Sequence, residues 1–296
     1  MPSPAGESAI TRVTTLAQLA TRGSWQLELA HDRPHALFIW LTRGQGLALI
    51  DGIRRGIGAH NALYIPAGAL MSLDLGRQGF GHALTLPDTS GMNLPQRPVH
   101  LRLREAPAQM ELNGLLDSMM REQAAARPML ETAMSAHAAL VAVWLHRQMT
   151  RPGPELVSDT SAHRILRAFA ERITRPDSDH FSLEDHAAAI DVTPTHLARV
   201  CKAETGRTAA TLITERRLHR ARTLLAETEM PVQDIARSLG FASAAYFTRF
   251  IQQHCGASPS ALRRGPVRPT LQTAVVTSAP QKARVAFGPG SGETKH

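Results

Sequence analysis

The stretch DVTPTHLARVCKAETG, residues 191–206, places a short turn between two helical patterns and ends on a glycine. Thr193 can cap a helix with its hydroxyl, and Pro194 is tolerated at the first helical position, where its missing N–H costs nothing. Gly206 suits the left-handed backbone that often ends a helix. The stretch therefore predicts a helix that stops, turns and restarts at once, with Arg199 on the second helix.

A second copy of this pattern lies about fifty residues further along the chain. Residues 183–206 align with residues 232–256 at an offset of 49 before the turn and 50 after it. Ser243 then stands where Thr193 stands in the first copy, and Gly256 closes the second copy. Two copies favour a pair of helix-turn-helix units over two ordinary helical hairpins.

The second helix of each copy has an apolar face and an opposite face of small, polar and basic side chains. The apolar positions are Leu197, Val200, Cys201, Phe247, Phe250 and Ile251. The outward positions are Thr195, Ala198, Arg199, Lys202, Ala245, Arg249 and Gln252, with Tyr246 at the edge. A helix docked by its apolar face can present such a stripe to base edges in the DNA major groove.

One long helix, from Ala209 to about Glu227, joins the two copies and carries four arginines. A rigid connector fixes the separation of the two recognition helices, and roughly 34 Å would place them in successive major grooves. We expect the outward arginines of the connector to be structural or to face phosphates. The residues assigned to the DNA backbone are Lys202, Gln252 and Arg216.

The charge balance favours a polyanionic partner. The chain has 33 basic and 25 acidic side chains, a net charge of +8, and only three of the basic residues are lysine. Residues 161–265 hold 15 basic and 11 acidic side chains. Arginine suits nucleic acid because its guanidinium forks onto phosphates and guanine edges. A GC-rich genome that favours arginine codons would give the same composition.

The chain shows no sign of a membrane or a secretory route. Its apolar runs are too short to span a bilayer, and its first ten residues lack the pattern of a secretory signal. Two cysteines indicate a reducing compartment. Cys201 falls on the apolar face of a recognition helix and should be packed, whereas Cys255 should be more exposed. We expect a cytoplasmic protein without a membrane partner.

Short apolar runs separated by turn signals predict strands from Ser24 to about Arg104. The runs are WQLELA, HALFIWLT, GLALI, NALYIP, ALMSLDL and HALTL. Asp51-Gly52 is a strong hairpin signal between two of them. The pattern predicts a small antiparallel barrel or sandwich. From about Pro107 the apolar period becomes helical and predicts two helices, the second from about Met129 to Met149.

The helix pair either covers the strands or makes a dimer. The family resemblance described below implies a dimer here and places at its two-fold interface Met119, Met120, Leu140, Val143 and Trp144. The expected segments are a strand-rich domain at 1–107, the helix pair at 108–150, a linker at 151–160, an all-α domain at 161–265 and a disordered tail at 266–296. The fold class is therefore an antiparallel β domain with a helical pair, followed by an all-α double helix-turn-helix domain.

Residues from about Ser161 to Arg264 resemble the DNA-binding domain of the AraC/XylS transcription regulators. The resemblance rests on ETG at the end of the first recognition helix, on RRLHRARTLL in the connector and on PVQDIARSLGFASAAYFTRFIQQHCGASPSALRR. By position it implies that the base-reading residues are Thr195, Ala198, Arg199, Ala245, Tyr246 and Arg249. Threonine and alanine offer few side-chain hydrogen bonds, so the two arginines would carry direct readout and DNA shape would add to it.

The stretch GQGLALIDGIRRGIGAHNALYIPAG resembles the core of the cupin-like sensor barrel that many of these regulators carry. The candidate residues for binding a small-molecule effector there are His35, Trp40 and His82. The metal pattern of cupins is lacking, because Ala36 and Leu37 follow His35 and Met71 stands where a later histidine is needed. We expect no metal, no other cofactor and no catalytic residue.

These patterns favour a sequence-specific transcription regulator that binds double-stranded promoter or operator DNA. We expect a homodimer formed by the N-terminal half, a small-molecule effector and, in an activator, contact with RNA polymerase. One alternative is a cupin-type metalloenzyme fused to a DNA-targeting module, which a stoichiometric bound metal would reveal. The other is an architectural DNA binder, which competition with random DNA would separate from a specific regulator.

Overall fold

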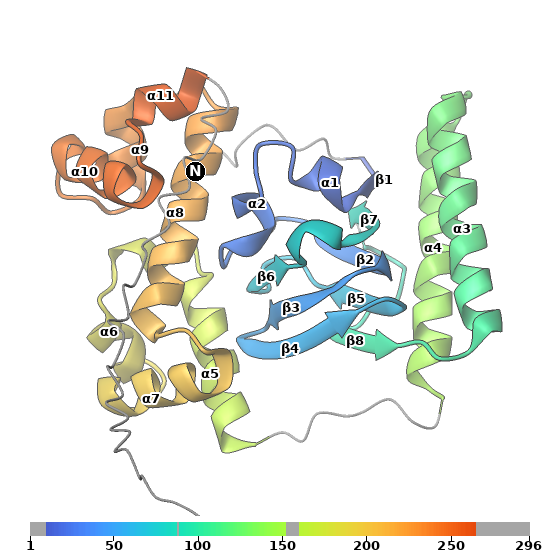
Figure 1. The fold of residues 1–296 in the computed structure, drawn as a ribbon, viewed down its shortest axis with the longest axis horizontal. Coiled ribbons are helices and arrows are strands. Elements are labelled where there is room, and N and C mark those ends of the chain that lie inside the picture. Colours follow the sequence, from blue (N-terminus) through green and yellow to red (C-terminus); the bar gives the residue numbers. More distant parts are fainter. Residues whose placement is uncertain (1–9, 88, 152–159, 265–296) are drawn as a thin grey trace, which may run out of the picture.

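The structure, a computed structural model, describes residues 10–87, 89–151 and 160–264. An N-terminal domain (residues 10–149) combines strands with a helix pair, and a C-terminal domain (residues 161–264) is helical (Figure 1). The linker expected at 151–160 lies almost entirely outside the described residues. The tail expected at 266–296 lies wholly outside them.

The strands of the N-terminal domain form two antiparallel sheets, in the orders β1-β7-β2-β5-β8 and β4-β3-β6. Their bounds are β1 Arg12–Thr15, β2 Ala36–Arg43, β3 Gln45–Ile50, β4 Ile53–Gly58, β5 Asn61–Ile65, β6 Met71–Asp74, β7 Phe80–Leu86 and β8 Val99–Arg102. β2 is the central strand of the larger sheet, and its side chains alternate between the two faces. Leu37 and Ile39 point into the layer between the sheets, whereas Phe38 and Trp40 point to the outer side. Because both faces are covered, β2 is apolar throughout its first six residues.

The two sheets do not close into the barrel that the family resemblance implies. Asp51 and Gly52 do form the expected hairpin turn between β3 and β4, with φ values of 53° and 75°. Among the described strands, however, no ladder joins β4 or β6 to the larger sheet. Met71 on β6 instead forms a single isolated β-bridge with His31. The arrangement is a sandwich of two sheets around an apolar layer.

One predicted strand is a helix. The run WQLELA begins with α2 (Trp25–Glu28), a single turn in which the Ser24 hydroxyl donates to the Glu28 carboxylate at 2.8 Å. Trp25 and Leu27 stand two positions apart, which imitates a strand. In the helix they point in different directions, Leu27 into the layer between the sheets and Trp25 toward the C-terminal domain. The prediction also missed β1, because its sequence, RVTT, is short and mostly polar.

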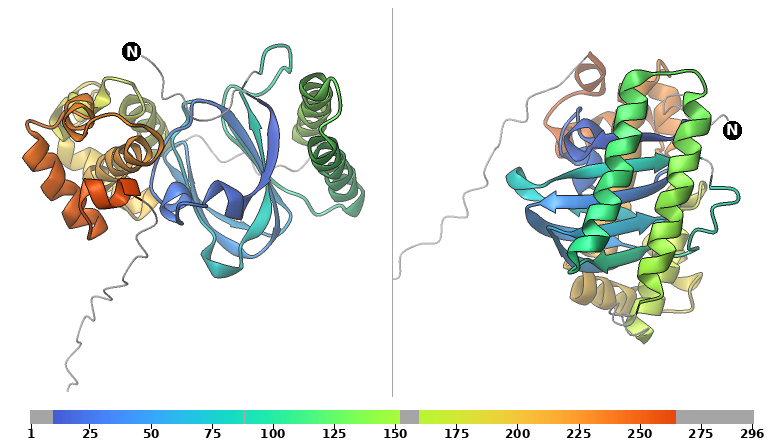
Figure 2. Two further views of the ribbon diagram at one scale, coloured as in Figure 1. Left: turned by 90° about the horizontal axis from the view of Figure 1, so that it is seen from above. Right: turned by 90° about the vertical axis from the view of Figure 1, so that its right-hand side faces the viewer.

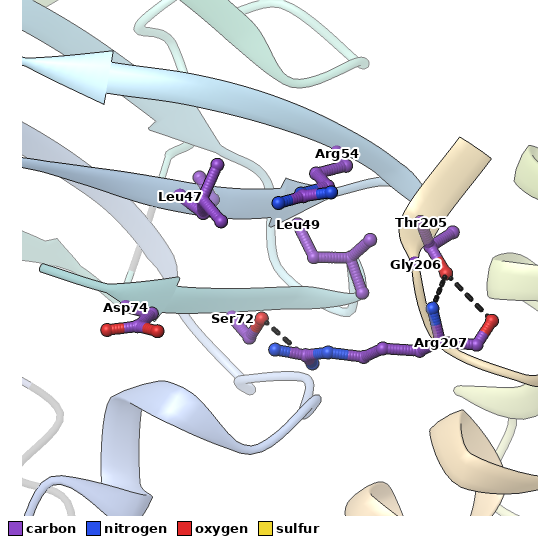
Figure 3. A pocket seen from close by; sticks show the side chains of 9 residues that line it. Leu47, Leu49, Arg54, Ser72, Asp74, Thr205, Gly206 and Arg207 are labelled. Atoms are coloured by element: carbon purple, nitrogen blue, oxygen red, sulfur yellow. Dashed lines mark hydrogen bonds between the residues drawn. The ribbon is translucent and has the colours of Figure 1, made fainter. Parts of the chain in front are cut away.

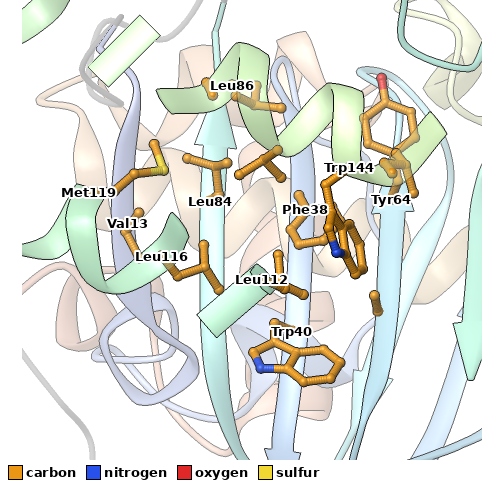
Figure 4. Packing of buried hydrophobic residues seen from close by; sticks show 14 of the residues in the cluster. Val13, Phe38, Trp40, Tyr64, Leu84, Leu86, Leu112, Leu116, Met119 and Trp144 are labelled. Carbon is orange, nitrogen blue, oxygen red and sulfur yellow. The ribbon is translucent and has the colours of Figure 1, made fainter. Parts of the chain in front are cut away.

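Two long helices, α3 (Ala106–Ala125) and α4 (Leu130–Met149), cover the outer face of the larger sheet (Figure 4). Met119 and Trp144 were expected at a dimer interface, but both are 0% exposed in this core. That assignment is wrong, because the outer side chains of the sheet need a cover of this size. Met120 also packs against the same cluster. Leu140 and Val143 lie on the other side of α4, 51% and 44% exposed.

The C-terminal domain contains the two predicted helix-turn-helix units, α6–α7 and α9–α10, joined by α8. Its elements are α5 Ser161–Ile173, η2 Ser178–His180, α6 Leu183–Ala188, α7 Pro194–Thr205, α8 Ala209–Glu227, α9 Val232–Ser238, α10 Ala244–Cys255 and α11 Pro259–Arg264; the N-terminal domain also holds α1 Leu16–Leu19 and η1 Gly76–Gln78. The connector predicted from Ala209 to about Glu227 is confirmed. None of the helices in the described ranges combines the length and apolar character that a membrane crossing requires.

The helix pair and the C-terminal domain lie on opposite sides of the sandwich (Figure 2). Leu49 and Leu70 of the N-terminal domain join Leu166 and Phe169 of α5 in one buried apolar cluster. Gly52 lies so close to α5 that a Cβ atom there would come within 2.7 Å of the Leu166 carbonyl oxygen. The two domains therefore share a core as well as a surface.

Candidate nucleic-acid interface

The first recognition helix, α7, begins and ends as its sequence predicts. The hydroxyl of Thr193 accepts a hydrogen bond from the His196 backbone N–H at 3.1 Å, and Pro194 occupies the first turn. Gly206 ends the helix with a φ of 75°. Leu197 and Cys201 are 0% exposed in the cluster shared with the N-terminal domain, which fixes the opposite side of α7 toward solvent.

The second recognition helix, α10, repeats this geometry. Ser243 caps its first turn by accepting from the Tyr246 backbone N–H at 3.1 Å, and Gly256 ends it with a φ of 68°. Phe247 and Ile251, equivalent to the buried residues of α7, are also 0% exposed. The two units therefore present equivalent faces, each held by an apolar anchor.

The residues predicted to contact DNA lie on the outward faces of the two helices. Exposed are Thr195, Arg199 and Lys202 on α7 and Ala245, Tyr246, Arg249 and Gln252 on α10, while Ala198 is half-buried. Lys202 donates from Nζ to the Gly206 carbonyl oxygen at 3.0 Å, which helps to satisfy the last turn of α7. This places the ammonium group of Lys202 near the end of the helix, still exposed to solvent.

His196 is a residue on this face that the sequence analysis missed. Its Nδ1 accepts a hydrogen bond from Nη2 of Arg199 at 3.1 Å, since a guanidinium can only donate. The offset of 50 between the two copies pairs His196 with Tyr246, which was predicted to read bases. Applying the offset of 50 to every residue of the helix would therefore have identified His196. Arg199 thus has a neighbour on α7 that orders its side chain.

Arg216 does not reach the surface where a phosphate could bind, so its assignment to the DNA backbone is wrong. The residue is 3% exposed, and its Nε donates to Asp32 Oδ1 of the N-terminal domain at 2.7 Å. It follows Ala209 and Leu212 at helical spacing on the buried side of α8. That spacing was readable in the sequence. The sequence did not show that the N-terminal domain covers this position.

The other connector arginines also have partners inside the protein. The side chains of Arg217 and Arg220 both reach Asp179, a carboxylate on η2 that is 5% exposed. Arg222 lies over the Trp25 ring, with its guanidinium carbon 4.3 Å from the ring centroid. The arginine content of α8 therefore reflects internal ion pairs and domain packing more than contact with DNA.

Two of the three effector candidates face the helix pair. Trp40 is 0% exposed and donates from Nε1 to Asn113 Oδ1 on α3 at 2.8 Å. His82 pairs with Trp40 across the sheet, and burial lowers its pKa although nearby Asp117 opposes this shift. His35 is half-buried just before β2. The alternation along β2 and β7 turns Trp40 and His82 away from the layer between the two sheets, so neither side chain lines that layer.

A pocket lies between the outer face of the smaller sheet and the turn that joins α7 to α8 (Figure 3). It is lined by Leu47, Ala48, Leu49, Arg54, Ser72, Asp74, Thr205, Gly206 and Arg207. Arg207 crosses the domain boundary here, donating from Nη1 to Ser72 Oγ at 3.2 Å and to Glu215 Oε2 at 2.7 Å. Leu47 remains 39% exposed. A small molecule in this pocket would touch both domains.

The cysteines and possible metal ligands add little chemistry to the site. Cys201 is buried, and burial raises the pKa of its thiol to about 12. Burial also raises the pKa of Cys255, while Arg222 opposes this shift. Within the ranges that the structure describes, no three His, Cys, Asp or Glu side chains come together in a way that could hold a metal ion.

Comparison with known proteins locates the similarity in the C-terminal domain. A family model described as a helix-turn-helix domain matches residues 186–265. The arabinose operon regulatory proteins of Salmonella typhimurium and Escherichia coli are each 30% identical, over 86 and 93 residues, which cover 29% and 30% of this chain and 31% and 32% of theirs. The chain therefore spans about a third of the length of these curated relatives.

Two solved structures also match parts of the chain. The C-terminal domain of AraT from Geobacillus stearothermophilus is 29% identical, with a TM-score of 0.33, and the match covers 36% of this chain and 87% of that one. ToxT from Vibrio cholerae is 13% identical, with a TM-score of 0.40, and the match covers 87% of this chain and 95% of that one. The sequence matches, together with the paired helix-turn-helix units, show that the C-terminal domain of this chain is similar to the corresponding domain of the arabinose operon regulatory proteins, which are AraC-type transcriptional regulators.

Proposed function

We propose that the chain is a sequence-specific DNA-binding transcription regulator that reads two successive major grooves with α7 and α10. The observation that carries this proposal is the equivalence of the two helices: each has a hydroxyl cap, a buried apolar anchor and an exposed arginine at the same position, Arg199 or Arg249. Arginine at such a position can fork onto the O6 and N7 atoms of guanine.

The connector supports reading of two grooves. A helix of 19 residues is about 28 Å long, so the two recognition helices at its ends can be separated by about one turn of DNA. The base-reading set in this proposal comprises Thr195, Ala198, Arg199, Ala245, Tyr246 and Arg249. Lys202 and Gln252 flank it as contacts to the DNA backbone, while the buried Arg216 makes no contact with DNA.

A selection from randomised DNA duplexes tests the proposal directly. The full chain should enrich a site with two motifs whose centres lie about 10–10.5 base pairs apart. The matched control is the double variant Arg199→Ala with Arg249→Ala, which keeps both caps and both apolar anchors and should enrich no such site. If the wild type retains random duplexes as well as selected ones, the chain is an architectural binder and the proposal fails.

We also propose that a small molecule controls DNA binding. The pocket between the domains supports this part, because it combines the exposed Leu47 with the polar side chains of Arg54, Ser72 and Asp74 and lies against the end of α7. A ligand there would act on the placement of the first recognition helix. This role leaves no need for a metal. A stoichiometric metal in the purified protein would instead favour an enzyme fused to a DNA-targeting module.

A homodimer through the helix pair completes the proposal. Large apolar side chains stay exposed on α3 and α4, namely Met110 at 69%, Leu140 at 51% and Val143 at 44%. Exposed apolar residues of this kind on a helix pair are typical of an interface with a second copy. Two copies would double the number of helix-turn-helix units on DNA, and an activator would place RNA polymerase beside them.

A further inference from the structure

Two ion pairs cross the domain boundary in the same direction, with the carboxylate in the N-terminal domain and the arginine in the C-terminal domain. Asp32 Oδ1 lies 2.7 Å from Arg216 Nε, and Asp51 Oδ2 lies 3.2 Å from Arg167 Nε. In both pairs the side chains are at most 23% exposed. Pairs shielded from water in this way interact more strongly than pairs on an open surface.

Arg216, the arginine of the first pair, makes further contacts inside the C-terminal domain. Its Nη1 donates to Ser178 Oγ at 2.9 Å, and its Nη2 donates to the Thr174 carbonyl oxygen at 3.0 Å. Thr174 caps the end of α5, and Ser178 begins η2. One guanidinium on α8 therefore ties the connector to the segment that leads into the first helix-turn-helix unit.

The charges around Arg216 explain why the carboxylate of Asp32 matters. Asp179 is shared among three arginines, Arg216, Arg217 and Arg220, and lies 3.6 Å from Arg216. One carboxylate cannot neutralise three guanidiniums, and a buried charge without compensation is costly. Asp32 supplies a second negative charge to this cluster, and it comes from the other domain.

We propose that Asp32 is a positioning residue for DNA recognition, acting through Arg216 on the arrangement of the two helix-turn-helix units. With Asp32 in place, Arg216 holds α8 against the end of α5 and η2, so the first unit has one orientation relative to the connector that carries the second. Without that charge, the guanidinium is drawn toward Asp179 or toward water, and the two units lose their fixed relation. This inference rests on the proposed reading of two grooves.

The test compares Asp32→Asn with the wild-type chain on three duplexes. The first carries the two-motif site selected by the wild type, the second has two base pairs inserted between the motifs, and the third has one motif only. Asp32→Glu keeps the charge and serves as the conservative variant. Asp117→Asn removes an exposed carboxylate from α3, on the far side of the sandwich, and controls for a general change of charge.

We expect Asp32→Asn to weaken binding to the two-motif duplex at least about fivefold, with little change on the one-motif duplex, so that the preference for the selected spacing falls. Asp32→Glu should recover part of this loss, and Asp117→Asn should resemble the wild type. A protein that was merely less folded would lose binding to the one-motif duplex as well, and its melting temperature would fall.

Trp25 gives an independent reading of the domain contact. It is 8% exposed and lies against His219 and Arg222 of α8, whereas the other two tryptophans, Trp40 and Trp144, are 0% exposed within the N-terminal domain. Acrylamide quenching should therefore rise in Asp32→Asn. Increased quenching with unchanged affinity for all three duplexes would overturn the positioning role, as would unchanged quenching. A wild-type chain that shows no preference for a two-motif site would instead overturn the proposed function.

Discussion

Arg199 donates a hydrogen bond from Nη2 to Nδ1 of His196 one turn earlier on α7, at 3.1 Å. At the equivalent place on α10, Tyr246 stands one turn before Arg249 and is 59% exposed. In both recognition helices a planar side chain thus precedes the arginine by three residues, the spacing at which helical neighbours meet. Such a neighbour reduces the number of conformations that the arginine must give up on binding.

Replacing either arginine by alanine should lower affinity for the selected site by about 1–3 kcal/mol and relax preference at one base pair. The reason is the loss of a forked contact to a guanine edge. Affinities for selected and scrambled duplexes at several salt concentrations check this. Arg199 and Arg249 would instead be contacts to the DNA backbone if both variants lost the same affinity for both duplexes and the salt dependence of binding fell by about one phosphate contact.

His196→Ala should lower affinity for the selected site by about 0.5–1.5 kcal/mol, less than Arg199→Ala, because it removes only a hydrogen bond that orders the arginine. In the Arg199→Ala background the same change should cost almost nothing, so a double-mutant cycle is the measurement. His146→Ala, on an exposed position of α4, is the matched control. Additive losses would show that His196 contacts DNA by itself.

Leu140→Glu and Val143→Glu should convert a dimer to a monomer in sedimentation equilibrium with little change in melting temperature, because both side chains are exposed within one protomer. Ser135→Glu, at an exposed position on the same helix, should leave the dimer intact. Met119→Ala should lower stability by about 2–5 kcal/mol because it leaves a cavity in the core. A wild-type chain that is monomeric at micromolar concentration would rule out this interface.

Alkylation at pH 8 should label Cys255 in the native protein well before Cys201. Burial raises the pKa of Cys201 to about 12, so almost no thiolate is present, and the residue is 0% exposed. Cys255 is half-buried at the end of α10. Mass spectrometry of iodoacetamide-treated peptides separates the two sites. Equal labelling of both in folded protein would mean that the core around α7 opens readily.

Acidification should destabilise the fold through His219. Burial, with Arg33 adding to the effect, lowers the pKa of His219 from 6.5 to about 3. Between these values the unfolded chain binds a proton that the folded chain does not, so stability falls as the pH drops below 6.5. From pH 7 to pH 5 this histidine alone should account for about 2 kcal/mol.

Urea unfolding of the wild type and of His219→Gln at both pH values measures the effect of this histidine. The variant should lose less stability on acidification, and His146→Gln should behave like the wild type. His31 stacks on His219 with ring centroids 4.1 Å apart, and burial lowers its pKa as well. The variant will therefore retain part of the acid sensitivity. An identical loss in wild type and variant would show that His219 is not responsible.

The helix-turn-helix units were predictable because their signals are local. Caps at Thr193 and Ser243, closing glycines and an apolar face at helical spacing all act within one helix, and the repeat doubled each signal. The bounds of α8 followed from the same logic. Arg216 was misassigned because its partner, Asp32, is distant in sequence, and nothing near Arg216 indicates a carboxylate from another domain.

The N-terminal domain was predicted less well for a related reason. The apolar run HALFIWLT predicted the strand β2, but it could not say which face meets α3 and which meets the second sheet. The sequence therefore named Trp40 and His82 as effector candidates without fixing the side of the sheet on which they lie. Closure of the sheets depends on which edges pair, a property of several strands at once. The strand pattern allowed either an antiparallel barrel or a sandwich, and the family resemblance favoured the barrel, whereas the strands form a sandwich.

The apolar cluster that joins Leu49 and Leu70 to Leu166 and Phe169 bears on how freely the two halves can be exchanged between regulators. A chimaera that grafts another DNA-binding domain onto these strands would leave Leu49 and Leu70 facing a foreign surface. The reverse graft would expose Leu166 and Phe169, and the junction around Gly52 has no room even for a methyl group. The two halves of this chain must therefore change together, because they are separate segments in the sequence but share one packed core.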